Sequence, residues 1–259
     1  MSPIKVIVHG ALGQVGREVV RTAALDPATK LVGAVDIKAT TKSLNIPDTS
    51  DSVPLSTNLE EIIDATKPDV MVDFTVALAA MPAIRIAAKK KVNMVIGTTG
   101  FSQYDLNEID RLAKENNVGA IVASNFALGA VVMMHLAKIA AKYFDYAEII
   151  ELHHNHKLDA PSGTSLYTAN GMAQSRGKPF HIPPGPVRGQ MIEGITLHSI
   201  RLPGLMAHQE VLFGTAGQTL SIRHDTINRE CYTPGVMLAV KEVGKLKGLT
   251  QGLDKLLNL

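Results

Sequence analysis

The sequence contains no tryptophan, and only 4% of its 259 residues are aromatic. Proteins that bind single-stranded nucleic acid without sequence preference stack bases on aromatic side chains, so this composition argues against such a role. The formal net charge is only +2. That is too small to indicate attraction to nucleic acid or to an anionic membrane. We therefore expect neither a nucleic-acid partner nor a membrane partner.

Cysteine and long apolar segments are also scarce. The one cysteine, Cys231, excludes an internal disulfide framework and fits a reducing cytosol. The longest apolar run, Phe126 to Leu136, is too short to span a bilayer. The first residues lead into a strand rather than into the apolar segment of a secretory signal. The expectation is a soluble, cytoplasmic protein.

What the sequence does contain is typical of a globular protein, with 46% hydrophobic and 19% charged residues. The length suits one large α/β domain or two smaller domains. In the first half, strand-like and helix-like segments alternate, which predicts βαβ units and a parallel sheet. The predicted strands are 5–9, 31–35, 69–74, 93–96 and 119–123, and predicted helices include 77–91 and 103–116.

A glycine-rich turn, G-x-x-G-x-x-G, joins the first strand to a helix with apolar residues on one face. Glycine lets the chain turn sharply and lets a pyrophosphate approach the backbone. Asp36 ends the second strand, twenty residues after Gly16, where a carboxylate can accept hydrogen bonds from the adenine ribose. A purely structural turn with a surface aspartate is the alternative, but the position between strand and helix favours nucleotide binding. The predicted cofactor residues here are Gly10, Ala11, Leu12, Gly13, Gln14, Val15, Asp36 and Lys38.

Small and hydroxyl residues follow the later strands of this half. Because parallel strands end at one edge of a sheet, the segments 74–75, 97–99 and 123–126 are expected to meet there, where such folds bind ligands. These residues suit a nicotinamide ring and its ribose, although capping of the loops is an equal alternative for the threonines. The predicted contacts are Gly97, Thr98, Thr99, Ala123, Ser124, Asn125 and Phe126.

The second half has a different pattern. An apolar helix is predicted at 129–144, with Met133, Met134 and His135 as core residues, and a strand is predicted at 147–153. Three later strands follow one another without a helix between them, which indicates an antiparallel or mixed sheet. They are 195–202, 208–215 and 219–224, preceded by a proline-rich loop at 180–187 and followed by a helix at 233–246.

The predicted fold is therefore α/β. Residues 1–126 plus 232–259 are assigned to a Rossmann-like parallel-sheet domain that binds a dinucleotide. Residues 127–231 are assigned to a second, α+β domain for substrate binding and oligomerisation, built on a mixed, largely antiparallel sheet.

The segment 151–164, E-L-H-H-N-H-K-L-D-A-P-S-G-T, concentrates groups that move protons near neutral pH. Its Ser-Gly-Thr end, at a helix start, offers backbone N–H groups to an anion. Proton donors beside an anion site indicate a small acidic substrate.

If residues 150–156 are extended, His153, Asn155 and Lys157 share one face and His154 and His156 share the other. Such a split, together with the lack of cysteine ligands, argues against a metal site. A purely structural role for the histidines is the other alternative. We expect at least two of them to act in catalysis or substrate binding.

The pattern E-x-H-H-x-x-K-x-D-A-P-S-G-T resembles the signature of the 4-hydroxy-tetrahydrodipicolinate reductase family, also called dihydrodipicolinate reductases. The agreement extends over nearly the whole chain and includes the glycine turn and the segments 73–75, 95–101, 125–126 and 201–204. The resemblance implies NAD(P)H-dependent reduction in the diaminopimelate route to lysine. It also implies a small dicarboxylate substrate, a homotetramer, and hinge closure between the domains.

The resemblance also implies individual roles. His153 matches the family's catalytic acid/base, Lys157 its proton donor, and His154 a substrate contact that we expect to be an imidazolium. Gly163 and Thr164 match further contacts to the substrate carboxylates, and the predicted cofactor residues match the family's cofactor contacts. Some members carry an arginine directly after the acidic residue, whereas here Ile37 and then Lys38 follow Asp36. We therefore expect both NADH and NADPH to work, with NADH equal or better.

Two other functions fit parts of the pattern. Another two-domain dehydrogenase, such as one acting on aspartate, would share the glycine turn and the mixed sheet. A non-catalytic NAD-sensing regulator would need a DNA-binding or partner-binding module, and no basic helix-turn-helix segment is evident.

Overall fold

The computed structural model describes residues 2–182, 185 and 188–259. The chain forms two compact units. The first contains the residues up to Phe126 together with Tyr232–Asn258, and the second contains Ala127–Cys231 and Leu259. The predicted proline-rich loop at 180–187 lies partly outside the described residues.

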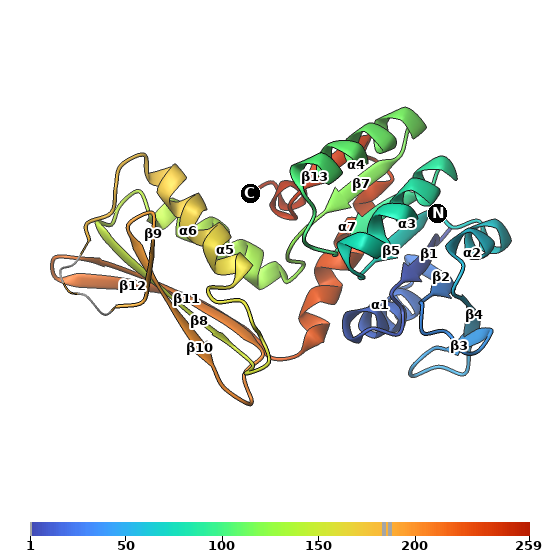
Figure 1. The fold of residues 1–259 in the computed structure, drawn as a ribbon, viewed down its shortest axis with the longest axis horizontal. Helices are drawn as coiled ribbons and strands as arrows, with labels where there is room; N and C mark the ends of the chain where they lie inside the picture. Colours follow the sequence, from blue (N-terminus) through green and yellow to red (C-terminus); the bar gives the residue numbers. More distant parts are fainter. Residues whose placement is uncertain (1, 183–184, 186–187) are drawn as a thin grey trace. The chain divides into compact units, whose positions relative to one another are not determined.

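The first unit is built on a sheet with the strand order β13-β7-β6-β5-β1-β2-β4-β3 (Figure 1). All neighbouring pairs are parallel except β3 with β4. The strands are β1 (Ile4–His9), β2 (Thr29–Val35), β3 (Ser43–Asn45), β4 (Ser52–Ser56), β5 (Val70–Asp73), β6 (Asn93–Ile96), β7 (Gly119–Val122) and β13 (Gly248–Gln251). The helices are α1 (Gln14–Leu25), α2 (Leu59–Thr66), α3 (Ala77–Lys89), α4 (Gln103–Asn116), α7 (Thr233–Val243) and the short 3₁₀ helix η2 (Asp254–Leu257).

The central strands are covered on both faces. Every residue of β5 is buried, as expected for a continuous apolar run in a parallel sheet. Helices α2, α3 and α4 share one core cluster with these strands, while α1 packs against α7. The arrangement confirms the Rossmann-like prediction and leaves the carboxyl ends of the strands at one edge.

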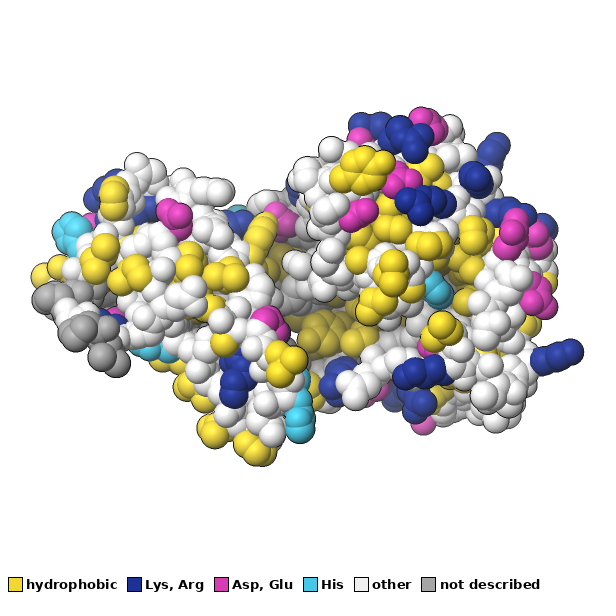
Figure 2. Space-filling view, in the orientation of Figure 1, with side chains coloured by type: hydrophobic (Ala, Val, Ile, Leu, Met, Phe, Trp, Pro, Cys, Tyr) yellow, Lys and Arg dark blue, Asp and Glu magenta, His cyan; other side chains and the backbone are white. Residues whose placement is uncertain are grey.

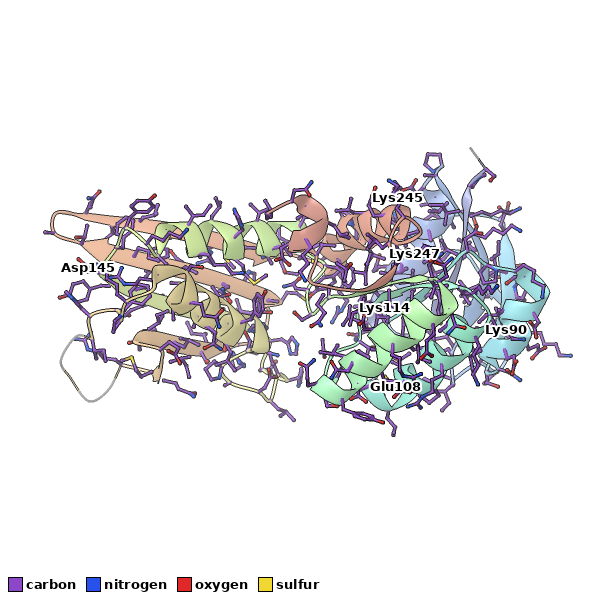
Figure 3. All side chains as sticks on the ribbon, turned by 90° about the horizontal axis from the view of Figure 1, so that it is seen from above. Lys90, Glu108, Lys114, Asp145, Lys245 and Lys247 are labelled. Atoms are coloured by element: carbon purple, nitrogen blue, oxygen red, sulfur yellow. The ribbon has the colours of Figure 1, made fainter. Side chains whose placement is uncertain are left out.

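Ion pairs join neighbouring helices at the surface of this unit. Arg85 of α3 binds Glu108 of α4 through two hydrogen bonds, and Lys90 binds Asp64 of α2 at 2.8 Å (Figure 3). Cations and anions are interspersed over the visible face (Figure 2). Exposed pairs contribute about 0–1 kcal/mol each, so the stability of this unit comes mainly from its core.

The second unit has a five-stranded sheet in the order β12-β11-β8-β10-β9. Strands β8 and β10 are parallel and the other pairs antiparallel, so the predicted mixed sheet is confirmed. Helices α5 and α6 share one core cluster with this sheet. The elements are α5 (Leu128–Ala140), β8 (Tyr146–His153), α6 (Gly163–Arg176), β9 (Gln190–Ile192), β10 (Ile195–Arg201), β11 (Ala207–Thr215), β12 (Gln218–Thr226) and η1 (Arg229–Tyr232).

Two predicted helices are shorter than expected. The helix predicted at 129–144 ends at Ala140, and the following residues turn toward β8. Arg176 of α6 donates from Nη1 to the carbonyls of Ala141 and Phe144, which satisfies them without a further helical turn. The helix predicted at 233–246 ends at Val243, because the chain then forms strand β13 beside β7. Met133 and Met134 are core residues as predicted, whereas His135 is only half-buried.

Candidate active site

Four parallel strands of the first unit end at the same level. His9 of β1 lies beside Asp73 of β5, Asp73 beside Ile96 of β6, and Ile96 beside Val122 of β7. The loops that follow therefore open at one edge of the sheet, as the sequence predicts. This edge gathers every cofactor residue predicted from the strand ends.

The glycine turn packs tightly against its own backbone. Gly10 has φ +84°, and a Cβ added to Gly16 would lie 2.0 Å from the Gly10 carbonyl oxygen. Glycine at these positions is therefore required by the turn and by close helix packing. Gly13 is the N-cap of α1, and the first turn of that helix contains no acidic residue. Its first N–H groups, which have no intrahelical partner, suit an anion such as a pyrophosphate.

Asp36 is not the surface residue of the structural alternative. It is only 7% exposed, and its Oδ2 accepts from the Leu12 N–H at 2.9 Å. Its Oδ1 accepts from the Lys38 N–H at 2.9 Å. The backbone thus orients the carboxylate, and each oxygen keeps a lone pair for a hydroxyl donor. This geometry fits an adenine ribose.

Thr98 shows that the loop-capping alternative applies to at least one threonine. Its hydroxyl donates to Oδ1 of the fully buried Asp73 at 2.5 Å and accepts from the Thr75 N–H at 2.8 Å. Asp73 also binds Nδ1 of His9 at 2.5 Å. Because the Thr98 hydroxyl is engaged in this way, any cofactor contact made by this residue should come from its backbone.

Aromatic rings shape the same edge. A Cβ on Gly97 would lie 2.2 Å from the Phe74 ring, so glycine is needed for this contact. The rings of Phe74 and Phe126 pack with their centroids 5.7 Å apart. Gly97 and Phe126, both predicted cofactor residues, are therefore joined through Phe74.

In the second unit, the histidine segment is a turn rather than an extended strand. β8 ends at His153, beside Arg201 at the end of β10. Beyond this point the Lys157 N–H donates to the His154 carbonyl at 3.1 Å. Residues 150–156 are therefore not extended throughout, because β8 ends at His153, and the division of the histidines between two faces, which depended on that condition, does not apply.

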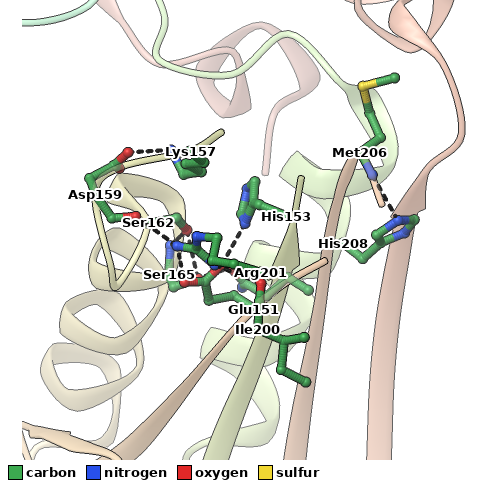
Figure 4. A network of polar contacts seen from close by, with 11 residues as sticks. Glu151, His153, Lys157, Asp159, Ser162, Ser165, Ile200, Arg201, Met206 and His208 are labelled. Carbon is green, nitrogen blue, oxygen red and sulfur yellow. Dashed lines mark hydrogen bonds and ion pairs between the residues drawn. The ribbon is translucent and has the colours of Figure 1, made fainter. Parts of the chain in front are cut away.

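His153 is held by a buried carboxylate (Figure 4). Its Nδ1 is hydrogen-bonded to Oε2 of Glu151, which is fully buried. Arg201 binds both oxygens of that carboxylate, Nη1 to Oε2 and Nη2 to Oε1, each at 2.8 Å. Burial acts to raise the pKa of Glu151, but hydrogen bonds from His153, Arg201 and Ser199 outweigh it and lower the pKa to about 2. Glu151 is therefore a carboxylate at neutral pH.

Lys157 lies in the loop that joins β8 to α6. Its Nζ is 2.8 Å from Oδ1 of Asp159, and the side chain is partly buried. This ammonium, acting chiefly through the hydrogen bond, lowers the pKa of the Asp159 carboxyl. The pair holds the ammonium in place, and its charge acts on the nearby His154.

His154, unlike Lys157, has no anionic partner among the described residues and is surrounded by positive charges. Its Nδ1 is buried and has no hydrogen-bond partner among the residues that the structure describes. Burial lowers the pKa of His154, and the charges of His153, His156, Lys157 and Arg229 lower it further. The expected imidazolium is thus disfavoured in the ligand-free chain, and an anion beside His154 would favour it.

The start of α6 offers donors to an anion. Ser162 is the N-cap, and its hydroxyl accepts from the Ser165 N–H at 3.2 Å. This leaves the N–H groups of Gly163 and Thr164, the two residues predicted to bind the substrate. A Cβ on Gly163 would meet nothing within 4 Å, so this position borders open space.

A buried hydrogen-bonded network fixes the start of α6 to the sheet. Ser165 donates to Oε1 of Gln209 on β11 at 2.8 Å, and Gln209 donates from Nε2 to Thr168 at 2.9 Å. Gln209 lies directly opposite Glu151 in the β11–β8 ladder. Adjacent strand positions therefore support the histidine and the anion site.

Within the described residues, no three histidine, cysteine, aspartate or glutamate side chains are placed to hold a metal ion. None of the helices described is long and apolar enough to cross a membrane.

Comparison with known proteins identifies the family. The family model "Dihydrodipicolinate reductase, N-terminus" matches residues 4–126, and "Dihydrodipicolinate reductase, C-terminus" matches residues 129–257. The chain belongs to the dihydrodipicolinate reductase family. The residues that carry the histidine turn, the glycine turn and Asp36 all lie inside the matched regions.

Relatives in the dihydrodipicolinate reductase family match over their full length. A 4-hydroxy-tetrahydrodipicolinate reductase of Dehalococcoides mccartyi (strain CBDB1) is 57% identical over 263 residues, covering 100% of both chains. That of Bacillus subtilis (strain 168) is 45% identical, covering 98% of both. The solved dipicolinate-bound dihydrodipicolinate reductase from Paenisporosarcina sp. TG-14 is 41% identical with a TM-score of 0.86, covering 98% of this chain and 99% of that one.

Other dehydrogenases share only the fold. An amine dehydrogenase from Mycobacterium smegmatis is 15% identical with a TM-score of 0.69, covering 96% of this chain and 95% of its own. Such likeness explains why another two-domain dehydrogenase fits part of the sequence pattern. Membership of the dihydrodipicolinate reductase family argues against both this alternative and the regulator.

Sequence reasoning missed the side chains that support the site. Glu151 lies two residues before His153 on a strand, so their shared face was a usable signal. Arg201 and Gln209 contact the site through strand pairing, which local sequence does not reveal. Asp159 lies inside the recognised motif, but no signal there pointed to Lys157 as its partner.

Proposed function

We propose that this chain reduces 4-hydroxy-tetrahydrodipicolinate to tetrahydrodipicolinate with NADH or NADPH, in the diaminopimelate route to lysine. The chain is an NAD(P)H-dependent oxidoreductase of the dihydrodipicolinate reductase family, and relatives bearing the name of this activity match it over its full length. The structural observation that carries the proposal is one loop, between β8 and α6, which carries His154 and Lys157 and leads to the uncapped N–H groups at the start of α6. A small dicarboxylate is the substrate class that such a loop suits.

Binding of the two carboxylates is assigned to the helix start and to His154. The N–H groups of Gly163 and Thr164 would hold one carboxylate, since no side chain caps them. His154, with its unpartnered buried Nδ1, would bind a carboxylate as a donor. Lys157 adds positive charge next to them.

The reaction takes up a hydride and a proton and releases the 4-hydroxyl as water. Bound NAD(P)H supplies the hydride. The remaining steps are proton transfers near a dianion, and we assign them to Lys157 as the proton donor and to His153 as an acid/base. The Lys157–Asp159 pair holds the ammonium in place until a substrate atom accepts its proton.

The nucleotide is assigned to the first unit, residues 1–126 plus 232–259, and the substrate to residues 127–231. Asp36 would bind the adenine ribose, and the start of α1 the pyrophosphate. Lys38, an exposed residue of the same loop, is the candidate partner of a 2′-phosphate.

We further propose a homotetramer in the cytoplasm, as the family resemblance and the cysteine content suggest.

A coupled assay tests this function. Aspartate semialdehyde and pyruvate are condensed enzymatically, and the product is mixed with the purified protein and NADH or NADPH. We expect loss of nicotinamide absorbance that depends on the condensation product. Folded protein that oxidises neither cofactor in this mixture would refute the proposal, and aspartate with NAD⁺ serves as the test of the rival dehydrogenase.

A further inference from the structure

We propose that Glu151 and Arg201 are positioning residues that fix His153 with its Nε2 free for the substrate and tie it to the loop that carries Lys157. The inference rests on the catalytic role of His153 proposed above. It assigns neither residue a direct contact with the substrate.

The carboxylate determines which nitrogen of His153 carries hydrogen. An ionised carboxylate only accepts hydrogen bonds, so the bond between Glu151 and His153 requires Nδ1 to be the donor. Nε2 is then the nitrogen available for proton transfer, in either charge state of the ring. Because the pKa of Glu151 is lowered to about 2, this acceptor is ionised at neutral pH.

The side chain of Glu151 is held in one orientation by burial and by hydrogen bonds. It is fully buried on the side of the sheet that packs against α5 and α6, between β10 and β11. The two guanidinium nitrogens of Arg201 bind its two oxygens, a fork that fixes both the position and the plane of the carboxylate. His153 is therefore oriented by a rigid pair.

Arg201 also connects the two proton-handling groups. Its Nη2 donates to the Asp159 carbonyl at 2.6 Å as well as to Glu151. The Asp159 carboxylate in turn holds Nζ of Lys157 (Figure 4). One continuous set of contacts, His153–Glu151–Arg201–Asp159–Lys157, thus supports both proposed proton donors.

The charges of the pair oppose each other beside His153. With both present, the imidazole faces a carboxylate whose charge is balanced by a guanidinium. Without Arg201, the unbalanced carboxylate favours the imidazolium; without the Glu151 charge, the guanidinium disfavours it. The two removals should therefore displace the pH dependence of the reaction in opposite directions, which an ion pair that stabilised the fold without acting on His153 would not do.

The test compares pH profiles of kcat/KM for Glu151→Gln, Arg201→Gln and Arg201→Lys. We expect Glu151→Gln to lower kcat about 100-fold or more, the range of a positioned acid or base. Its histidine-dependent limb should move to lower pH, and that of Arg201→Gln to higher pH. Arg201→Lys should keep the wild-type pH midpoint while losing rate. Shifts in the same direction, or wild-type kcat in Glu151→Gln, would overturn the inference.

Two controls separate the possible failures. Glu148→Gln removes a carboxylate from the opposite face of the same strand, where it pairs with His198 at 2.9 Å, and should leave kcat and the pH profile unchanged. His153→Asn is measured in parallel, and normal activity in that variant refutes the proposed function of His153. If His153→Asn loses activity while Glu151→Gln keeps a normal kcat, only the positioning role of Glu151 is refuted. If a variant does not fold, ¹⁵N NMR of the wild type still decides, since hydrogen on Nε2 rather than Nδ1 of neutral His153 would contradict the proposal.

Discussion

Lys157 and His154 lie in the same loop, but the surrounding residues stabilise the positive charge of Lys157 and disfavour a positive charge on His154. Lys157 has an anionic partner, Asp159, at 2.8 Å. His154 has a buried Nδ1 with no partner in the described part of the chain, and the surrounding cations lower its pKa. A dicarboxylate would thus meet one preformed cation and one group that gains its charge on binding.

We predict that Lys157→Ala lowers kcat at least about 100-fold, because a positioned proton donor contributes roughly 10²–10⁴-fold. NADH affinity, measured by fluorescence titration, should change little. Near-normal turnover would show that another group delivers the proton.

For His154, we predict proton uptake on ligand binding. Burial and the surrounding positive charges lower the pKa of His154 in the free chain, and a bound dianion would raise it, so binding should be accompanied by proton uptake. Calorimetric titration with dipicolinate in buffers of different ionisation enthalpy measures this uptake, which His154→Ala should abolish. The variant should also raise the substrate KM roughly 10- to 100-fold, the value of a charge-assisted hydrogen bond. An unchanged KM with collapsed turnover would reverse the roles given to His153 and His154.

Among the helices and strands, those whose bounds depend on neighbouring residues in sequence were predicted well, and those that depend on pairing with distant strands were not. Helix α4 was predicted to the residue, since Ser102 and Asp105 form a capping box at its start. Strand β13 was missed because it is short and owes its existence to pairing with β7. The strand predicted at 147–153 ends at the same residue as β8, His153. Local sequence does not show whether the chain continues extended beyond His153, because that depends on β10, which ends opposite His153 at Arg201.

The start of α6 permits a test that separates binding from folding. We predict that Gly163→Ala leaves thermal stability unchanged or slightly higher, because the added methyl group meets no protein atom within 4 Å. The same methyl group would enter the space proposed for a carboxylate. The substrate KM should therefore rise about tenfold or more, the cost of a lost charge-assisted hydrogen bond. An unchanged KM would place the carboxylate elsewhere.

The loop after β2 sets the expected choice of nucleotide. Asp36 should favour NADH by repelling a 2′-phosphate, and Lys38 should partly offset that repulsion. We predict that both cofactors work, with NADH equal or better by at most about tenfold, or roughly 1.4 kcal/mol. Asp36→Ala should weaken NADH more than NADPH, and Lys38→Ala should weaken NADPH selectively. These changes are read from kcat/KM, and a hundredfold wild-type preference for NADPH would exclude Asp36 as the ribose anchor.

For the whole molecule, the ion pair in the second unit links stability to pH. The pKa of Glu151 is lowered from 4.5 to about 2, so folding favours its charged form. That stabilisation is present above pH 4.5 and is lost as the pH falls toward 2. Glu151→Gln should therefore lower the free energy of unfolding at pH 7, by about 3–5 kcal/mol if it leaves Arg201 unpaired. The difference from wild type should shrink between about pH 5 and 2 in urea titrations, and a constant difference would contradict the assignment.

The discontinuity of the first unit has a consequence for biosynthesis. Its edge strand β13 and helix α7, which packs against β6 and β7, are translated after residues 127–231 of the second unit. During synthesis, the edge of β7 that pairs with β13 stays unpaired while residues 127–231 emerge from the ribosome. Unpaired strand edges can pair with other chains and cause aggregation. Residues 127–231, which form all but one residue of the second unit, can fold during that interval. Nascent chains that have released residues 127–231 but not yet residues 248–251 would therefore carry a folded second unit beside a first unit with an unpaired strand edge.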